Sequence, residues 1–128
     1  MGSGKRRALP VVAAPSAWQV KAPPALRDSI SHWERMRDNI DCGESPYTGG
    51  CACCKHWYQT NCHRCPVRLR TGVPGCGGVS NPYAEAQRAW ENASYHDRPV
   101  SAWKAASQAE IDFLRETLRM VEAGEVKP

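Results

Sequence analysis

Six of the seven cysteines lie between Cys51 and Cys76, and their spacing is typical of a metal site. Cys51 and Cys54 form one C-x2-C pair, and Cys62 and Cys65 form a second pair after a gap of seven residues. Two residues between cysteines let one tight turn present both sulfurs to one ion, and two such turns supply the four thiolates of a tetrahedral zinc site. We therefore predict one structural Zn²⁺ held by these four cysteines.

One position of this ligand set is open. Cys76 is the alternate ligand, because it could replace Cys62 and close the site together with Cys65 across the intervening turn. A histidine can also take the place of a thiolate at zinc. His56 and His63 are near enough in sequence, but each is more simply explained as an exposed polar residue beside a turn.

The other two cysteines are not expected to bind metal. Cys53 is predicted to be a packing residue that faces away from its neighbours, and Cys42 is an isolated thiol in a loop. An iron–sulfur cluster is the competing interpretation of the metal, since four cysteine thiolates also hold such clusters. No other feature of the chain indicates electron transfer, so zinc is the expected cofactor.

The cysteines are expected to be reduced. Their number is odd, so disulfides alone would leave one thiol unpaired. Lys5, Arg6 and Arg7 could begin a signal peptide, but the run that follows them is weakly apolar and interrupted by prolines. No run approaches the ~20 apolar residues of a membrane span. We therefore expect a cytoplasmic protein with no membrane partner.

Residues 1–24 are predicted to be a disordered, basic and Pro/Ala-rich tail, because each proline lacks an amide donor and restricts its own φ. A helix is predicted from about Pro24 to Ile40, since Pro23 and Pro24 stand where a helix start tolerates proline. Its apolar residues recur at steps of four, three, three and four, which is the stripe of an amphipathic helix. They are Leu26, Ile30, Trp33, Met36 and Ile40.

Two further helices are predicted after the cysteine segment, residues 51–78. Asn81 is the expected N-cap and Pro82 a first-turn residue of the first one, which is expected to break within the stretch from Asn92 to Pro99. Ser107 and Glu110 have the spacing of a capping box, which predicts a C-terminal helix over about residues 108–123. The apolar positions of the two helices are Tyr83, Ala86, Trp90 and Ala93 in the first, and Ile111, Leu114, Leu118 and Val121 in the second.

These elements predict a small, mainly α, single domain over residues 25–124. About three helices are expected around a four-cysteine, knuckle-type site in an otherwise irregular segment. A domain of this size buries a limited fraction of its surface and often needs a metal or covalent staple. The zinc ion is expected to stand in for core that so short a chain does not build.

The cysteine segment is also locally basic, which raises a nucleic-acid interpretation. There is no Asp or Glu between Ser45 and Ala84, and cations alternate there with aromatic rings that could stack on bases. Four thiolates around one zinc ion carry a net charge of about −2, which offsets part of this charge. The candidate nucleic-acid or partner contacts are Lys55, Trp57, Tyr58, Arg64, Arg68 and Arg70.

The order of motifs resembles small cysteine-rich proteins of tailed bacteriophages and prophages. The residues that carry the resemblance run from about Cys51 to Tyr83, roughly a quarter of the chain. They are Cys51-x2-Cys54, Cys62-x2-Cys65-Pro66, Thr71-Gly72, Cys76 and Pro82-Tyr83. The chain departs from that pattern at Cys53, where an apolar residue is usual. The resemblance implies a zinc-binding protein acting in a bacterial host cytoplasm, and it implies no activity.

The leading functional hypothesis is a zinc-stapled interaction protein that binds a host or phage protein through exposed aromatic anchors. Nucleic-acid binding is the alternative. A zinc-dependent, deaminase-like enzyme is a minor alternative, because His32 and Glu34 form an H-x-E triplet upstream of Cys62 and Cys65. The helical stripe places Trp33 inward and these two residues outside it, so we predict no enzyme and no small-molecule substrate.

Overall fold

The computed structural model describes residues 15–47, 52–57, 63–72, 82–95 and 100–128. Within these residues the chain forms helices and no strand, which confirms the predicted mainly α class. The number of helices differs from the predicted three, and two of them lie in the segment expected to be irregular. They are α1 (Ala17–Asp38), α2 (Ala52–Trp57), α3 (Pro66–Thr71), α4 (Pro82–Tyr95) and α5 (Val100–Glu122).

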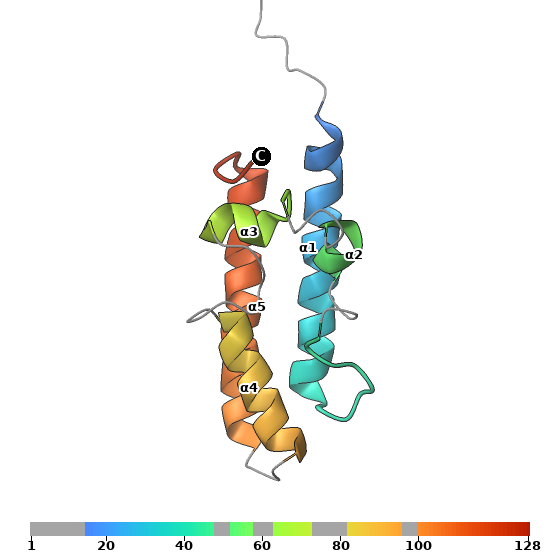
Figure 1. The fold of residues 1–128 in the computed structure, drawn as a ribbon, viewed down its shortest axis with the longest axis vertical. Coiled ribbons are helices and arrows are strands. Elements are labelled where there is room, and N and C mark those ends of the chain that lie inside the picture. Colours follow the sequence, from blue (N-terminus) through green and yellow to red (C-terminus); the bar gives the residue numbers. More distant parts are fainter. Residues whose placement is uncertain (1–14, 48–51, 58–62, 73–81, 96–99) are drawn as a thin grey trace, which may run out of the picture.

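The two long helices form the frame of the molecule. Figure 1 shows α1 and α5 side by side and running in opposite directions. Helix α4 packs along α5, α2 packs on α1, and α3 lies against α5. The two short helices of the cysteine segment thus rest on two different long helices.

Helix α1 begins earlier than predicted. The hydroxyl of Ser16 accepts a hydrogen bond from the backbone N–H of Gln19 (3.2 Å), and the Gln19 side chain accepts one from the Ser16 N–H (2.8 Å). This capping box starts the helix at Ala17, so Pro23 and Pro24 lie inside it. Residues 17–24 therefore belong to the fold rather than to the expected tail, whereas residues 1–14 lie outside the described part of the chain.

Burial accounts for a helix that contains two prolines. An interior proline costs about 3 kcal/mol in helix propensity. Trp18 is 5% exposed and Ala22 is fully buried, both on the stretch that precedes the prolines. Burying one large apolar side chain contributes roughly 1.5–3 kcal/mol, so burial of Trp18 offsets part of the cost of the two prolines.

Helix α5 also begins earlier than predicted. It is continuous from Val100, and Ser107 lies within it rather than at its N-cap. The Ser107 hydroxyl is buried and donates a hydrogen bond to the carbonyl of Trp103 (2.8 Å). The predicted stop is confirmed: the helix ends at Glu122, and Gly124 takes a left-handed φ of 76°.

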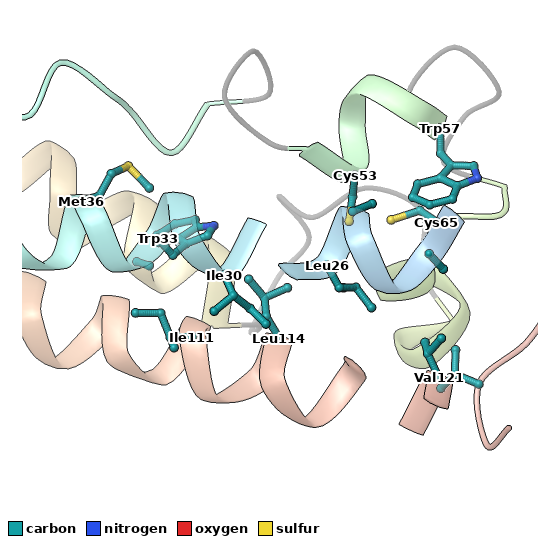
Figure 2. Close-up of a cluster of buried hydrophobic side chains, with 14 of the residues drawn as sticks. Leu26, Ile30, Trp33, Met36, Cys53, Trp57, Cys65, Ile111, Leu114 and Val121 are labelled. Carbon is teal, nitrogen blue, oxygen red and sulfur yellow. The ribbon is translucent and has the colours of Figure 1, made fainter. Parts of the chain in front are cut away.

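The core lies mainly between α1 and α5. Figure 2 shows Leu26, Ile30 and Trp33 on α1 facing Ile111 and Leu114 on α5. The predicted apolar stripes of both helices are buried in this cluster, apart from Ile40 and Leu118, which pack against it at its margin. Trp103 is fully buried and donates its indole N–H to the Met36 carbonyl at 3.0 Å. The two long helices therefore supply most of the apolar core, and the expected part of zinc in stabilising the domain stays a prediction.

Helix α4 begins at Pro82 as predicted, and its N-terminal neighbour Asn81 lies outside the described residues. The helix ends at Tyr95, within the stretch from Asn92 to Pro99 where the break was expected. In the described part of the chain, none of the helices combines the length and apolarity that crossing a membrane requires.

Candidate functional site

Two of the four preferred zinc ligands are described. Cys54 is half-buried on α2, and Cys65 is 3% exposed at the N-cap of α3. Cys51, Cys62 and the alternate ligand Cys76 lie outside the described residues. Among the residues that are described, no group of three His, Cys, Asp or Glu side chains is arranged to hold a metal ion. The zinc site stays a prediction that rests on the spacing of all four cysteines.

Cys53 and Cys42 have other surroundings. Cys53 is 1% exposed on the inner side of α2, where the Ser29 hydroxyl lies 3.7 Å from its sulfur. This is the packing position that its place between the ligands predicts. Cys42 is half-buried in the loop after α1, with its sulfur 3.8 Å from a carboxylate oxygen of Glu44.

The first turns of α1 form the support for the cysteine segment. Trp18 donates its indole N–H to the Arg64 carbonyl at 2.6 Å, directly before Cys65. The Lys21 ammonium lies 5.5 Å from the centre of the Trp57 ring, at the end of α2. Figure 2 shows Cys53, Trp57 and Cys65 grouped at one end of the core cluster. Helix α1 therefore contacts the segment that carries Cys54 and Cys65 at two points.

The predicted nucleic-acid contacts are only partly available. Trp57 is 5% exposed, so its ring is not a stacking surface. The Arg70 guanidinium lies 4.1 Å from the centre of the Phe113 ring and donates hydrogen bonds to the Phe113 carbonyl (2.8 Å) and the Thr117 hydroxyl (2.9 Å). Arg70 thus ties α3 to α5.

The remaining candidate nucleic-acid contacts are three basic residues within the described part of the chain and one tyrosine outside it. Lys55 and Arg64 are exposed, Arg68 is half-buried, and Tyr58 lies outside the described residues. Within the described residues, neither Lys55 nor Arg64 forms an ion pair through its side chain. Two cations of the predicted set therefore remain free to meet phosphate.

The two polar residues of the H-x-E triplet, His32 and Glu34, both contact other groups of the fold. His32 was expected outside the helical stripe, but its side chain is 5% exposed because the loop after α1 folds back over it. Its Nδ1 lies 2.8 Å from Glu44 Oε1, and its Nε2 lies 3.1 Å from the Ser45 carbonyl. The Glu34 carboxylate on α1 forms an ion pair with the Arg115 guanidinium on α5 at 2.8 Å. Both ring nitrogens are engaged, so this arrangement does not fit the ligand and acid/base pair of a zinc deaminase.

Glu44 is the centre of this polar cluster. Arg35 donates two hydrogen bonds to its carboxylate, at 2.6 and 2.8 Å. These bonds and the contact with His32 lower the pKa of Glu44 to about 2. An open pocket of about 600 Å³ lies beside the cluster, lined by polar side chains of α1 and α2 that include Asp28 and Lys55.

A cluster of aromatic side chains at the surface contains Trp90 and Tyr95, two of the aromatic residues considered as partner anchors, and Tyr47, which sequence reasoning missed. Tyr47, Trp90 and Tyr95, here called the aromatic cluster, join the loop after α1 to the last two turns of α4. The centres of the Tyr47 and Trp90 rings are 5.6 Å apart at an interplanar angle of 85°, and those of Trp90 and Tyr95 are 5.6 Å apart at 82°. Tyr47 is 38% exposed and Tyr95 is 64% exposed.

Local contacts fix the position and protonation of Tyr47. The Tyr83 hydroxyl donates a hydrogen bond to the carbonyl of Pro46, which holds the loop against α4. Partial burial, a hydrogen bond with Tyr95 and the negative charge of Glu91 raise the pKa of Tyr47 to about 12. Its hydroxyl therefore stays neutral at physiological pH.

The tryptophans divide sharply between core and surface. Trp18, Trp33, Trp57 and Trp103 are buried, and Trp90 alone of the five is half-buried. Among the tryptophans, only Trp90 can therefore serve as an aromatic anchor for a partner, together with the neighbouring Tyr47 and Tyr95. No protein-family model, no curated protein and no solved structure matches the chain.

Proposed function

We propose that the chain is a zinc-stabilised helical interaction protein of the phage type, and that the aromatic cluster is its contact surface for a partner protein. The single observation that carries the proposal is the exposure of Tyr47 and Tyr95 against Trp90, on a fold that buries its other tryptophans. Tyrosine and tryptophan are enriched at the energetic centres of protein interfaces.

The rigidity of the cluster supports this proposal. Helix α4 presents Trp90 and Tyr95, and hydrogen-bonded loop contacts hold Tyr47 in place. Aromatic side chains have few rotatable bonds, and preorganised groups lose little entropy on binding. Burial of these aromatic rings by a partner would therefore contribute to the binding free energy with a small entropic cost.

The zinc ion belongs to the proposal as a local staple. Helices α2 and α3 have six residues each, and helices of that length are marginal on their own. Cys54 and Cys65 offer soft sulfur donors on α2 and at the start of α3, which is the donor chemistry that zinc prefers. An ion held by Cys51, Cys54, Cys62 and Cys65 would join the two short helices.

The other functional hypotheses draw less support. For nucleic-acid binding, the basic segment offers exposed Lys55 and Arg64, whereas Trp57 and Arg70 are engaged within the fold. For a deaminase-like enzyme, His32 would have to leave both Glu44 and Ser45 to reach a metal.

The proposal is tested by affinity capture from a bacterial lysate with tagged chain, in the presence and absence of nuclease. The Tyr47→Ala/Tyr95→Ala double variant removes two of the three rings. The matched control is Val20→Ala, which removes another exposed apolar side chain (61% exposed) on α1. We expect the wild-type chain and the control to retain one partner that the double variant loses.

Two outcomes would contradict the proposal. Retention of the same partner by the double variant would remove the aromatic cluster from the interface. Loss of capture on nuclease treatment would instead favour nucleic acid. Circular dichroism of each variant confirms that the helices are intact before capture is compared.

A further inference from the structure

The geometry of the aromatic cluster points to a more specific recognition chemistry. The rings of Tyr47 and Tyr95 each stand nearly perpendicular to the Trp90 indole, at 85° and 82°. Aromatic faces are electron-rich, and a cation within about 6 Å of a ring centre is attracted by the ring quadrupole. The exposed rings of Tyr47 and Tyr95, each centred 5.6 Å from the Trp90 ring, therefore bring several aromatic faces to one place.

Among the described residues, the charged side chain that acts on Tyr47 is an acid. Glu91 follows Trp90 directly and lies four residues before Tyr95, and it acts on the Tyr47 hydroxyl. The last turn of α4 contains no basic residue, and the C-terminus of a helix carries partial negative charge. Tyr47 adds no charge at physiological pH because its pKa is raised to about 12. The described surroundings of the rings are thus negative.

None of the described lysine or arginine side chains lies over a ring of the aromatic cluster. Lys21 lies over Trp57 and Arg70 lies over Phe113, both within the fold. Arg88 stands one turn before Glu91 on α4, but within the described residues it forms no ion pair and no ring contact. Within the described residues, the faces of the aromatic cluster carry no cation of the chain itself.

We infer that the aromatic cluster and Glu91 together bind an arginine or lysine side chain of the partner protein. This inference rests on the proposed function and specifies the partner's chemistry. A purely apolar partner would bury the Glu91 carboxylate and the tyrosine hydroxyls without compensation, which is costly. A guanidinium or ammonium group stacks on the rings and pairs with Glu91 at once.

The test is an NMR titration of the full ¹⁵N-labelled chain with acetyl-Gly-Arg-Gly-amide. Its matched probe is the citrulline peptide, which has nearly the same size and shape but no charge, because a carbonyl oxygen replaces one NH2 group of the guanidinium. The reporter is the indole N–H of Trp90, assigned with Trp90→Phe. We expect a saturable shift with the arginine peptide, and at least about threefold weaker binding of the citrulline peptide.

Variants on α4 separate charge from packing. Glu91→Gln is expected to weaken binding of the arginine peptide about threefold or more. The control is Glu85→Gln, an exposed acid in the first turn of the same helix, which should leave the affinity unchanged. Equal binding of both peptides, no saturable shift up to about 20 mM peptide, or no effect of Glu91→Gln would overturn the inference.

Two further outcomes distinguish the inference from the proposed function and from self-association. If Tyr47→Ala/Tyr95→Ala abolishes partner capture but Glu91→Gln does not change it, the proposed function stands and cation recognition is overturned. If the Trp90 signal shifts with protein concentration, and replacing Lys5, Arg6 and Arg7 by Gln removes that shift, a second copy of the chain is the occupant and the assignment to a partner protein is overturned.

Discussion

The indole N–H of Trp18 donates a hydrogen bond to the carbonyl of Arg64 at 2.6 Å, between residues 46 positions apart in the sequence. This contact joins the first turn of α1 to the residue before Cys65. Helix α1 continues through Pro23 and Pro24, and the turn that precedes these prolines places Trp18 in the core. Burial of Trp18 therefore favours the helical conformation of this turn.

We expect Trp18→Phe to lower the free energy of unfolding by about 1–2 kcal/mol. Phenylalanine keeps much of the packing but leaves the partly buried Arg64 carbonyl without its donor, which costs about that much. Trp18→Ala should cost about 3–5 kcal/mol, since it also leaves a cavity. Urea unfolding monitored by circular dichroism measures both. No loss for Trp18→Phe beside a full loss for Trp18→Ala would show that packing, and not the hydrogen bond, fixes this contact.

Zinc content provides the second prediction. We expect about one zinc ion per chain after purification, measured by inductively coupled plasma mass spectrometry, and a colourless protein. Cys54→Ser and Cys65→Ser should each abolish stoichiometric zinc, whereas Cys42→Ser should keep it. Zinc retention in the Cys54→Ser and Cys65→Ser variants would refute the ligand set.

Chelation should act locally. Because most residues of the core cluster lie on α1 and α5, removing zinc is expected to leave most of the helical signal in place. The amide protection of α2 and α3 should fall first, since each has six residues and depends on neighbouring contacts. Complete loss of helix on chelation would restore the idea that zinc replaces the main core.

The long helices illustrate how far the sequence predicts the fold. The stripe of Leu26, Ile30, Trp33 and Met36 was found from its spacing, because an amphipathic period is a local signal. The starts of both long helices were wrong. Ser16 and Gln19 make a true capping box that the two prolines after it obscured, whereas the similar spacing of Ser107 and Glu110 lies inside a helix.

The difference between those two motifs is set by distant contacts. Trp103 is buried against Met36, which extends α5 backward past Ser107. A four-residue motif does not contain that information. The same holds for the sites: Tyr47 and Trp90 are brought together from two separate elements, and His32 is covered by a loop that follows its own helix. Such relationships depend on the fold and not on local spacing.

Arg70 provides a test of whether the basic segment serves the fold. We expect Arg70→Met to lower the free energy of unfolding by about 2 kcal/mol, because it removes two charge-assisted hydrogen bonds and the contact with the Phe113 ring. The matched control is Arg64→Met, which removes an exposed cation and should change stability little. If Arg70→Met is as mild as the control, the guanidinium is not bound to α5 in solution.

The last prediction concerns acid stability and Glu44. The contacts with Arg35 and His32 lower the pKa of this carboxylate from 4.5 to about 2, so the folded state holds its charged form more strongly than the unfolded state does. A carboxylate with a lowered folded-state pKa contributes stability above the unfolded value and loses it as the pH falls through the folded value. The contribution of Glu44 should therefore be complete above about pH 5 and disappear between about pH 4.5 and pH 2.

Substitution isolates this effect from the other acids. Because the partners are partly exposed to solvent, we expect Glu44→Gln to cost about 2 kcal/mol at pH 7. The difference from the wild-type chain should shrink to near zero at about pH 2, in urea unfolding curves collected at each pH. Glu116→Gln is the control, since its pair with Arg119 is exposed and should have little effect. A Glu44→Gln deficit that does not change with pH would mean that the carboxylate holds the loop by shape alone and not by its charge.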